Sequence, residues 1–295
     1  MRTAKRSLNL NFGNAGEISV MWRALWGEAM GKDFDNAIIV VTGASTGLGR
    51  AIAVETARRG AKAVVINFAR SAKEAEETAG LARAQGAEAI LVQADVGDDD
   101  GCSRIVKAAE VFGRVDALFN NAGITKFAPN HADLNAVSAE DFLHLYRVNV
   151  VGAFQMTRAA RALLEAAPSP SAIVNVSSIA AAIGIGSSVP YAASKGALTT
   201  MTLSLARALA PKIRVNAICP GFMDTPWFGK AVVGAALEQL RQHVIATTPL
   251  KVASSAEDIA GAAVFLASPA ARHVTGETLM ADAGMHLGFS SLSMR

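Results

Sequence analysis

The sequence predicts an α/β fold: one doubly wound, parallel sheet of seven strands with helices on both faces. Three observations carry this prediction. Short, continuous apolar runs alternate with longer helical stretches, as expected when parallel strands are buried on both faces. The first apolar run leads directly into a glycine-rich turn. Finally, 295 residues with 51% hydrophobic content suffice for one large core.

The alternation of strands and helices begins near residue 36. Apolar runs predict strands at residues 37–41, 63–67, 89–93, 117–120, 172–176, 213–218 and 277–281. Helical spacing predicts helices at residues 48–59, 72–85, 99–112, 139–166, 191–209 and 256–266. Only an apolar, partly helical insertion at residues 222–248 interrupts the alternation of strands and helices, and no linker marks a second domain. We therefore expect residues 36–295 to form a single domain.

Residues 1–35 differ from the rest of the chain. They contain Asn and Gly clusters and a weak apolar pattern around Trp22 and Trp26. A secretory signal needs an apolar core of about 7–15 residues, which this segment lacks. We interpret it as an N-terminal extension, either a leader or the product of a misplaced start codon, with Met30 as a natural start. The alternative is a short amphipathic helix that packs on a partner subunit.

Composition excludes several classes of function. A net charge of +3 is too slight to indicate nucleic-acid binding. Cys102 and Cys219 lie far apart without a CxxC pair, which argues against a disulfide framework or a zinc site and favours a reducing, cytoplasmic compartment. The five histidines show no metal-ligand spacing, and no run of 18 apolar residues predicts a membrane span. We expect no metal, nucleic acid or membrane partner.

The glycine-rich turn follows the first predicted strand and opens the first predicted helix. Its sequence, TGASTGLG at residues 42–49, places three glycines where a tight bend, close backbone approach and a helix N-terminus suit a pyrophosphate. The turn predicts a Rossmann-type dinucleotide site, against the alternative of an ordinary glycine turn. The expected contacts are Gly43, Ser45, Thr46, Gly47, Leu48 and Gly49.

Two further residues predict proton-transfer chemistry. Tyr191 and Lys195 are four residues apart and share one face of a helix. A phenol titrates near pH 10, and a nearby ammonium lowers its pKa, so Tyr191 is a candidate acid–base group. Ser178 lies thirteen residues upstream, after the strand at 172–176, at the edge of the sheet where ligands bind. Alone, the YxxxK spacing is equally typical of a surface pair.

Together, TGxxxGxG and YxxxK resemble the compact short-chain dehydrogenase/reductase family, over roughly residues 36–285. The resemblance implies that Ser178, rather than Ser177, stabilises charge on the substrate oxygen. It also implies that Tyr191 transfers the proton while Lys195 tunes it and binds the nicotinamide ribose. Asn149, in the predicted helix 139–166, matches the fourth catalytic residue and would hold a water or brace Lys195.

The same resemblance assigns cofactor contacts outside the glycine turn. The NNAG segment follows the fourth predicted strand, an Asp-Val pair follows the third, and a PGxxxT segment follows the sixth. These segments would meet the adenosine ribose, the adenine and the nicotinamide with its phosphates. The implied contacts are Asp95, Val96, Asn121, Ala122, Gly123, Pro220, Gly221, Phe222 and Thr225, together with Tyr191 and Lys195.

The second predicted strand indicates which nicotinamide cofactor is preferred. A carboxylate at its end would bind the ribose hydroxyls of NAD(H), but here Arg70 and Ser71 follow it. These residues suit a 2′-phosphate and favour NADP(H). Thr46 stands where many NADP-preferring relatives carry a basic residue, which weighs against the assignment. The alternative to phosphate recognition is that Arg70 is a solvated charge at the start of a helix.

The predicted function is hydride transfer between NADP(H) and a carbonyl or secondary alcohol, with a 3-oxoacyl reductase as the first named activity. The resemblance implies that the insertion at residues 222–248 caps the substrate. Apolar walls at residues 181–190 and 222–233 favour a substrate with a hydrophobic portion, and ordinary packing of the insertion against the body or a neighbouring subunit is the alternative. A sugar, steroid or cyclic alcohol dehydrogenase is the alternative, and a non-catalytic cofactor-binding regulator a remote one. An epimerase or dehydratase would have another glycine spacing. The resemblance implies a homotetramer, or a homodimer.

Overall fold

A computed structural model describes residues 32–229 and 233–288 and contains one seven-stranded sheet in the order β3-β2-β1-β4-β5-β6-β7. All its neighbouring strands run parallel. The strands are β1 (Ile38–Val41), β2 (Ala63–Phe68), β3 (Glu88–Gln93), β4 (Ala117–Asn120), β5 (Ser171–Val176), β6 (Ile213–Pro220) and β7 (Thr278–Ala281). The predicted doubly wound sheet is confirmed, and its order reverses between β1 and β4, where such sheets bind ligands.

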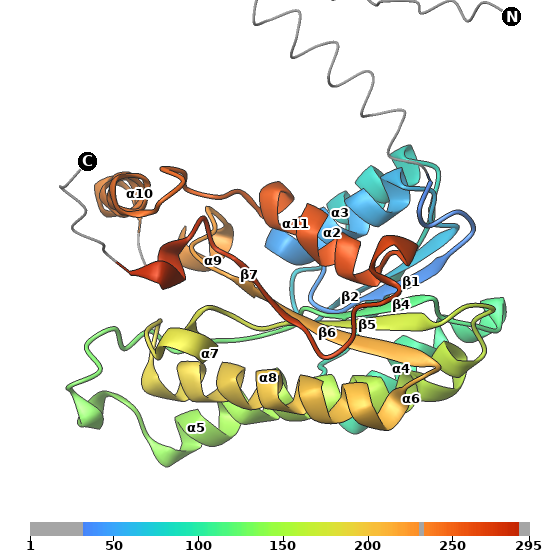
Figure 1. Ribbon diagram of the computed structural model, residues 1–295, viewed down its shortest axis with the longest axis horizontal. Coiled ribbons are helices and arrows are strands. Elements are labelled where there is room, and N and C mark those ends of the chain that lie inside the picture. Colours follow the sequence, from blue (N-terminus) through green and yellow to red (C-terminus); the bar gives the residue numbers. More distant parts are fainter. Residues whose placement is uncertain (1–31, 230–232, 289–295) are drawn as a thin grey trace, which may run out of the picture.

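Helices cover both faces of the sheet (Figure 1). One layer consists of α2 (Gly47–Arg58), α3 (Ala72–Ala84) and α11 (Ala256–Ala267). The other consists of α4 (Asp99–Lys107), α6 (Ala153–Glu165) and α8 (Val189–Leu209). Each layer encloses a separate apolar core, because the central strands are buried along their whole length and point side chains to both sides.

Three further helices lie at one end of the sheet (Figure 1). There α7 (Ala180–Ile183) follows β5, and α9 (Pro226–Gly229) and α10 (Ala235–Thr247) belong to the predicted insertion. Residues 230–232 of that insertion lie outside the described residues, as do residues 1–31 of the predicted N-terminal extension. The folded body begins ahead of the expected residue 36, since Phe34 is already buried in the core.

Two predicted helices differ in detail. The segment expected to be helical at 99–112 ends as an α-helix at Lys107 and closes with a 3-10 turn at Glu110–Phe112. The segment expected at 139–166 is helical throughout, but a π-helical turn at Arg147–Gly152 separates α5 (Ala139–Tyr146) from α6. Such turns arise from one extra residue in a helix and are frequent at functional sites.

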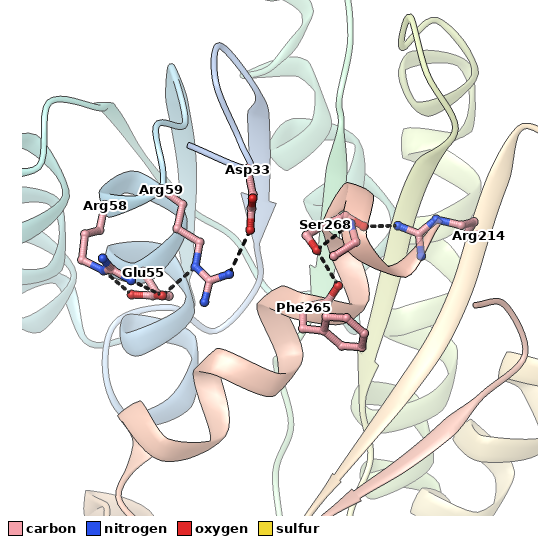
Figure 2. Close-up of polar contacts among 8 residues, drawn as sticks. Asp33, Glu55, Arg58, Arg59, Arg214, Phe265 and Ser268 are labelled. Carbon is pink, nitrogen blue, oxygen red and sulfur yellow. Dashed lines mark hydrogen bonds and ion pairs between the residues drawn. The ribbon is translucent and has the colours of Figure 1, made fainter. Parts of the chain in front are cut away.

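Two arginines anchor the helices that flank β1 and β6, and Figure 2 shows both. Arg59 pairs with Glu55 at 2.7 Å and with Asp33 at 3.2 Å, which ties the start of the described chain to the end of α2. Arg214 of β6 donates to the carbonyl oxygens of Leu266, Ala267, Ser268 and Val274. This buried guanidinium satisfies the free carbonyls at the end of α11.

Candidate active site

The glycine turn and the NNAG segment interlock at the carboxyl ends of β1 and β4. The hydroxyl of Thr42 accepts hydrogen bonds from the backbone N–H groups of Asn121 and Ala122, both at 3.0 Å. Gly43 has φ +60°, and a Cβ on it would lie 2.8 Å from the Cα of Ala122. A Cβ on Gly49 would lie 2.4 Å from Nδ2 of Asn121. These two glycines are therefore required by packing against the neighbouring loop.

The first turn of α2 leaves its backbone donors available. Thr46 precedes the helix with an extended backbone and makes no capping hydrogen bond with the described residues, and the first turn carries no acidic side chain. Ser45, Thr46 and Gly47 are only partly buried, while Leu48 and Gly49 are buried. A helix start with free N–H groups and a positive dipole end fits the diphosphate of a dinucleotide. Thr225 faces this turn, 3.7 Å from where a Cβ on Gly47 would stand.

Arg50 braces the turn from behind, a role that the sequence reading missed. Its Nε and Nη2 donate to the carbonyl oxygen of Ser45 at 3.1 and 2.9 Å. The Thr78 hydroxyl of α3 donates to the same oxygen at 3.0 Å. The position of Arg50, directly after the third glycine, was visible in the sequence, but its partner Thr78 is 28 residues away on another helix.

Ser178, Tyr191 and Lys195 meet at the carboxyl end of β5. Ser188 caps α8 and accepts from the backbone N–H of Tyr191 at 3.4 Å, which places Tyr191 in the first turn and Lys195 one turn later. The Ser178 hydroxyl lies close enough to the Tyr191 phenol to lower its pKa. The ammonium of Lys195 donates to the Val176 carbonyl oxygen at 2.7 Å and lies 5.8 Å from the Tyr191 ring centroid.

The electrostatics of this cluster correct one expectation. We expected Lys195 to lower the pKa of Tyr191, but burial raises that pKa to about 12, and the nearby Ser178 hydroxyl opposes this only in part. Burial also lowers the pKa of Lys195 to about 8. Desolvation disfavours the charged form of both groups and is the largest cause of both shifts. At neutral pH the phenol of Tyr191 therefore retains its proton.

Asn149 lies in the π-helical turn and acts as a clamp. Its Oδ1 accepts from the backbone N–H of Ile124 at 2.8 Å, and its Nδ2 donates to the Ile124 carbonyl at 3.0 Å and to the Ser194 hydroxyl at 3.0 Å. A Cβ on Gly123 would stand 3.3 Å from Oδ1 of Asn149 and 3.5 Å from Nζ of Lys195. Asn149 thus acts on Lys195 indirectly, because it holds in place the Gly123 backbone that lies beside the Lys195 ammonium.

The π-helical turn also packs on the predicted adenine pair. A Cβ on Gly152 would lie 2.9 Å from the carbonyl oxygen of Val96, so only glycine fits there. Val96 is buried, whereas Asp95 is exposed and accepts from the Gly97 N–H at 2.8 Å. Val96 therefore lies against the π-helical turn, and Asp95 lies exposed beside it, beyond the end of β3.

The end of β2 presents a cation to solvent. Arg70 is exposed immediately before α3, and its guanidinium makes no hydrogen bond or ion pair with any of the described residues. Ser71 is the residue that precedes α3, and its hydroxyl caps no described N–H. Asn67, the last polar residue of β2, is instead fully engaged, since its Oδ1 accepts from the Gly43 N–H at 3.2 Å.

The PGxxxT segment leaves the last residue of β6. Pro220 closes the strand, and a Cβ on Gly221 would lie 2.7 Å from Cβ of Asp282, so this segment rests on the loop after β7. Phe222 is buried. Beyond Thr225, the ring of Trp227 lies 6.2 Å from the ring of Tyr191, centroid to centroid, with 52° between the planes. The insertion therefore reaches the centre of the site.

The polar loop after NNAG contributes the opposite side of the cleft. Its Ala128 N–H donates to the Ser187 carbonyl at 2.7 Å, which joins the loop to the wall at residues 181–190. Lys126 pairs with Asp141 at 2.5 Å. His131 and Asp133 lie further along this loop, where Asp133 caps a short 3-10 turn at Leu134–Ala136.

Neither a metal-binding cluster nor a membrane-spanning helix is found among the described residues. No group of three or more His, Cys, Asp or Glu side chains there is placed to hold a metal ion. No helix in the described part of the chain has the length and apolar character needed to cross a membrane.

Comparison with known proteins decides the family. A family model described as enoyl-(acyl carrier protein) reductase, one of the short-chain dehydrogenase/reductase models, matches residues 43–286. This chain belongs to the short-chain dehydrogenase/reductase family. It is therefore an oxidoreductase, and the family uses NAD(H) or NADP(H).

Relatives of this short-chain dehydrogenase/reductase match it over nearly their whole length. A Streptomyces violaceoruber protein named ketoacyl reductase 2 of the granaticin polyketide synthase is 40% identical over 85% of this chain and 96% of its own. Glucose 1-dehydrogenase 2 of Bacillus subtilis is 36% identical over 89% of this chain and all of its own. A short-chain dehydrogenase/reductase structure from Burkholderia xenovorans superposes with a TM-score of 0.78, at 39% identity, over 86% of this chain and 99% of that one.

Proposed function

We propose that the protein is a carbonyl reductase that prefers NADP(H) and uses Tyr191 as its general acid. The observation that carries the proposal is the cluster of Ser178, Tyr191 and Lys195 between the glycine turn and an apolar wall. A nicotinamide cofactor, when bound, supplies or accepts the hydride. The residues of the chain bind, orient and transfer the proton.

Each residue has a distinct task in this proposal. Tyr191 holds a proton at neutral pH, because burial raises its pKa to about 12, and it donates that proton from Oη to the substrate oxygen. Ser178, whose hydroxyl lies close to the Tyr191 phenol, donates to the same oxygen as negative charge develops there. Lys195 holds the backbone at Val176 and supports Tyr191 with its positive charge. Asn149 keeps the Gly123–Ile124 backbone beside Lys195.

The preference for NADP(H) rests on Arg70, whose exposed guanidinium is free of the described residues and suits a 2′-phosphate. Arg70→Ala should weaken NADPH binding at least tenfold and leave NADH binding within twofold. Arg83→Ala, which removes the same charge at the far end of α3, is the matched control and should change neither. Fluorescence titration measures all four dissociation constants. Equal losses for both cofactors would show that Arg70 does not recognise the phosphate.

For the substrate, we propose a 3-oxoacyl thioester or a similar ketone with an apolar portion. The apolar wall and the ketoacyl reductase relative support this choice. The glucose dehydrogenase relative supports the alternative, a dehydrogenase of sugars, steroids or cyclic alcohols. Turnover of an acetoacetyl thioester with NADPH, set against oxidation of glucose with NADP⁺, separates the two. Turnover of glucose alone would refute the reductase proposal.

We also propose a cytoplasmic homotetramer, or a homodimer, in keeping with the family and with two buried cysteines that form no disulfide with each other. Light scattering on the purified protein measures the assembly. A monomer at micromolar concentration would contradict this part of the proposal.

A further inference from the structure

An indole ring borders the acid–base residue on the side of the insertion. Trp227 lies 6.2 Å from Tyr191 with the planes tilted by 52°, within the range in which aromatic rings attract one another. Trp227 is only partly buried, so part of the indole is accessible. A group attached to a carbonyl carbon at Tyr191 would therefore have an aromatic surface beside it.

A glycine in the wall at residues 181–190 adjoins the same ring. Gly186 has φ +155°, and a Cβ on it would stand 3.5 Å from Cδ1 of Tyr191, at ordinary contact distance. A side chain there would cover this part of the phenol ring, whereas glycine presents only backbone. Apolar side chains flank this glycine, since Ile185 is 57% exposed and Val189 is 37% exposed. The accessible surface around Tyr191 is thus aromatic on one side and aliphatic on the other.

Two charged residues of the flanking loops, Lys126 and Asp224, have ionic partners within the described part of the chain. Lys126 of the polar loop holds Asp141 at 2.5 Å, and Asp224, just before α9, pairs with Arg241 of α10. The wall at residues 180–190 contains no charged residue. A substrate carboxylate or phosphate placed here would meet no unpaired cation among these residues, and it would lose its hydration without compensation.

We propose that Trp227 is a specificity-determining residue and that the protein reduces uncharged ketones with a flat apolar group next to the carbonyl, which packs on the indole. This inference rests on the proposed function, because it assumes that the carbonyl lies at Tyr191. A flat, uncharged group satisfies both walls, whereas a polyhydroxylated sugar would leave its hydroxyl groups against apolar surface.

The test compares three methyl ketones on the full-length enzyme with NADPH. Acetophenone is flat and neutral, cyclohexyl methyl ketone is similar in size but not flat, and 4-acetylbenzoate is flat and charged. Because the intrinsic reactivities of these ketones differ, the readout is how Trp227→Leu changes the ratio of kcat/KM for acetophenone to that for cyclohexyl methyl ketone. We expect the ratio to fall about threefold to tenfold, through KM rather than kcat, from the size of aromatic pair energies.

Trp227→Phe is the matched control and should keep most of the ratio, because it keeps an aromatic ring. In the unsubstituted enzyme, 4-acetylbenzoate should have a kcat/KM at least about thirtyfold below that of acetophenone. An unchanged ratio in Trp227→Leu, or equal use of the charged ketone, would overturn the inference while leaving the reductase proposal standing.

A second readout does not depend on turnover. Trp22, Trp26 and Trp227 are the three tryptophans of the chain, so a W22F/W26F variant emits from Trp227 alone. Saturation with 1-phenylethanol in the presence of NADP⁺ should change this emission, and 1-cyclohexylethanol should change it less. If no ketone is reduced yet the emission responds in this way, the proposed function fails and the binding role of Trp227 stands. Emission that is unaffected by 1-phenylethanol would refute that role.

Discussion

The clamp formed by Asn149 can be removed with one substitution, Asn149→Ala. The change deletes three hydrogen bonds, two with the Ile124 backbone at 2.8 and 3.0 Å and one with Ser194 at 3.0 Å. At about 1 kcal/mol each, their loss should lower the free energy of unfolding by about 3 kcal/mol. It also frees the Gly123 backbone, which packs between Asn149 and Lys195.

We expect a second effect on catalysis. A displacement of about 1 Å beside reacting groups costs roughly a hundredfold in rate, or about 2.7 kcal/mol of activation free energy. Asn149→Ala should therefore lower kcat about a hundredfold with NADPH and an acetoacetyl thioester. Urea unfolding followed by circular dichroism measures the stability in parallel.

A buried asparagine outside the site provides the matched control. Asn175 of β5 accepts from Asn120 and donates to Thr202, both at 2.9 Å. Asn175→Ala should destabilise the protein by a comparable amount, about 2 kcal/mol, and leave kcat within about threefold. If the two variants lost activity equally, or if Asn149→Ala kept its kcat, the clamp would be structural only and our reasoning would be refuted.

Three more predictions follow from the same structure. Gly43→Ala should weaken NADPH binding at least tenfold, because Gly43 has φ +60° and the new Cβ would lie 2.8 Å from neighbouring backbone. Gly86→Ala should not weaken binding, because Gly86, at φ +94°, has open space around it. Equal NADPH dissociation constants for the two variants, measured by fluorescence titration, would contradict this prediction. The pKa of Lys195 is lowered to about 8, so Lys195 loses its charge as pH rises through 8 while Tyr191, with a pKa near 12, stays protonated. We therefore expect kcat/KM for reduction to decline above pH 8, and Lys195→Arg should move this decline to higher pH. If Lys195→Arg leaves the pH–rate profile unchanged, Lys195 is not the cause of the decline. Arg214→Met should lower the free energy of unfolding by about 3 kcal/mol, since four carbonyl oxygens lose a buried donor; urea unfolding that matches the unsubstituted protein would contradict this.

The sheet could be predicted from sequence because buried parallel strands leave unbroken apolar runs, and all seven predicted runs form strands. The position of Tyr191 next to Lys195 could also be predicted, since helical spacing alone brings them together. The direction of the Tyr191 pKa shift was predicted wrongly, because its burial depends on the walls around it, which come from distant segments.

Other features of the site could not be predicted from local sequence patterns. The contact of Trp227 with Tyr191 joins residues 36 positions apart through an insertion whose path no periodicity describes. The brace by Arg50 and the cap by Arg214 depend on partners from other elements. Long-range polar contacts of this kind depend on the fold, so they can be identified only once the fold is known.

The π-helical turn at Arg147–Gly152 restricts how this family member can vary in length. Each residue of an α-helix turns the chain by about 100°, so deleting one residue here would restore regular α-helix and rotate Asn149 away from Ile124. Point substitutions on the exposed side of α5 or α6 are free of this constraint, but a deletion is not. The six residues must therefore be inherited, or transplanted into another scaffold, as a unit.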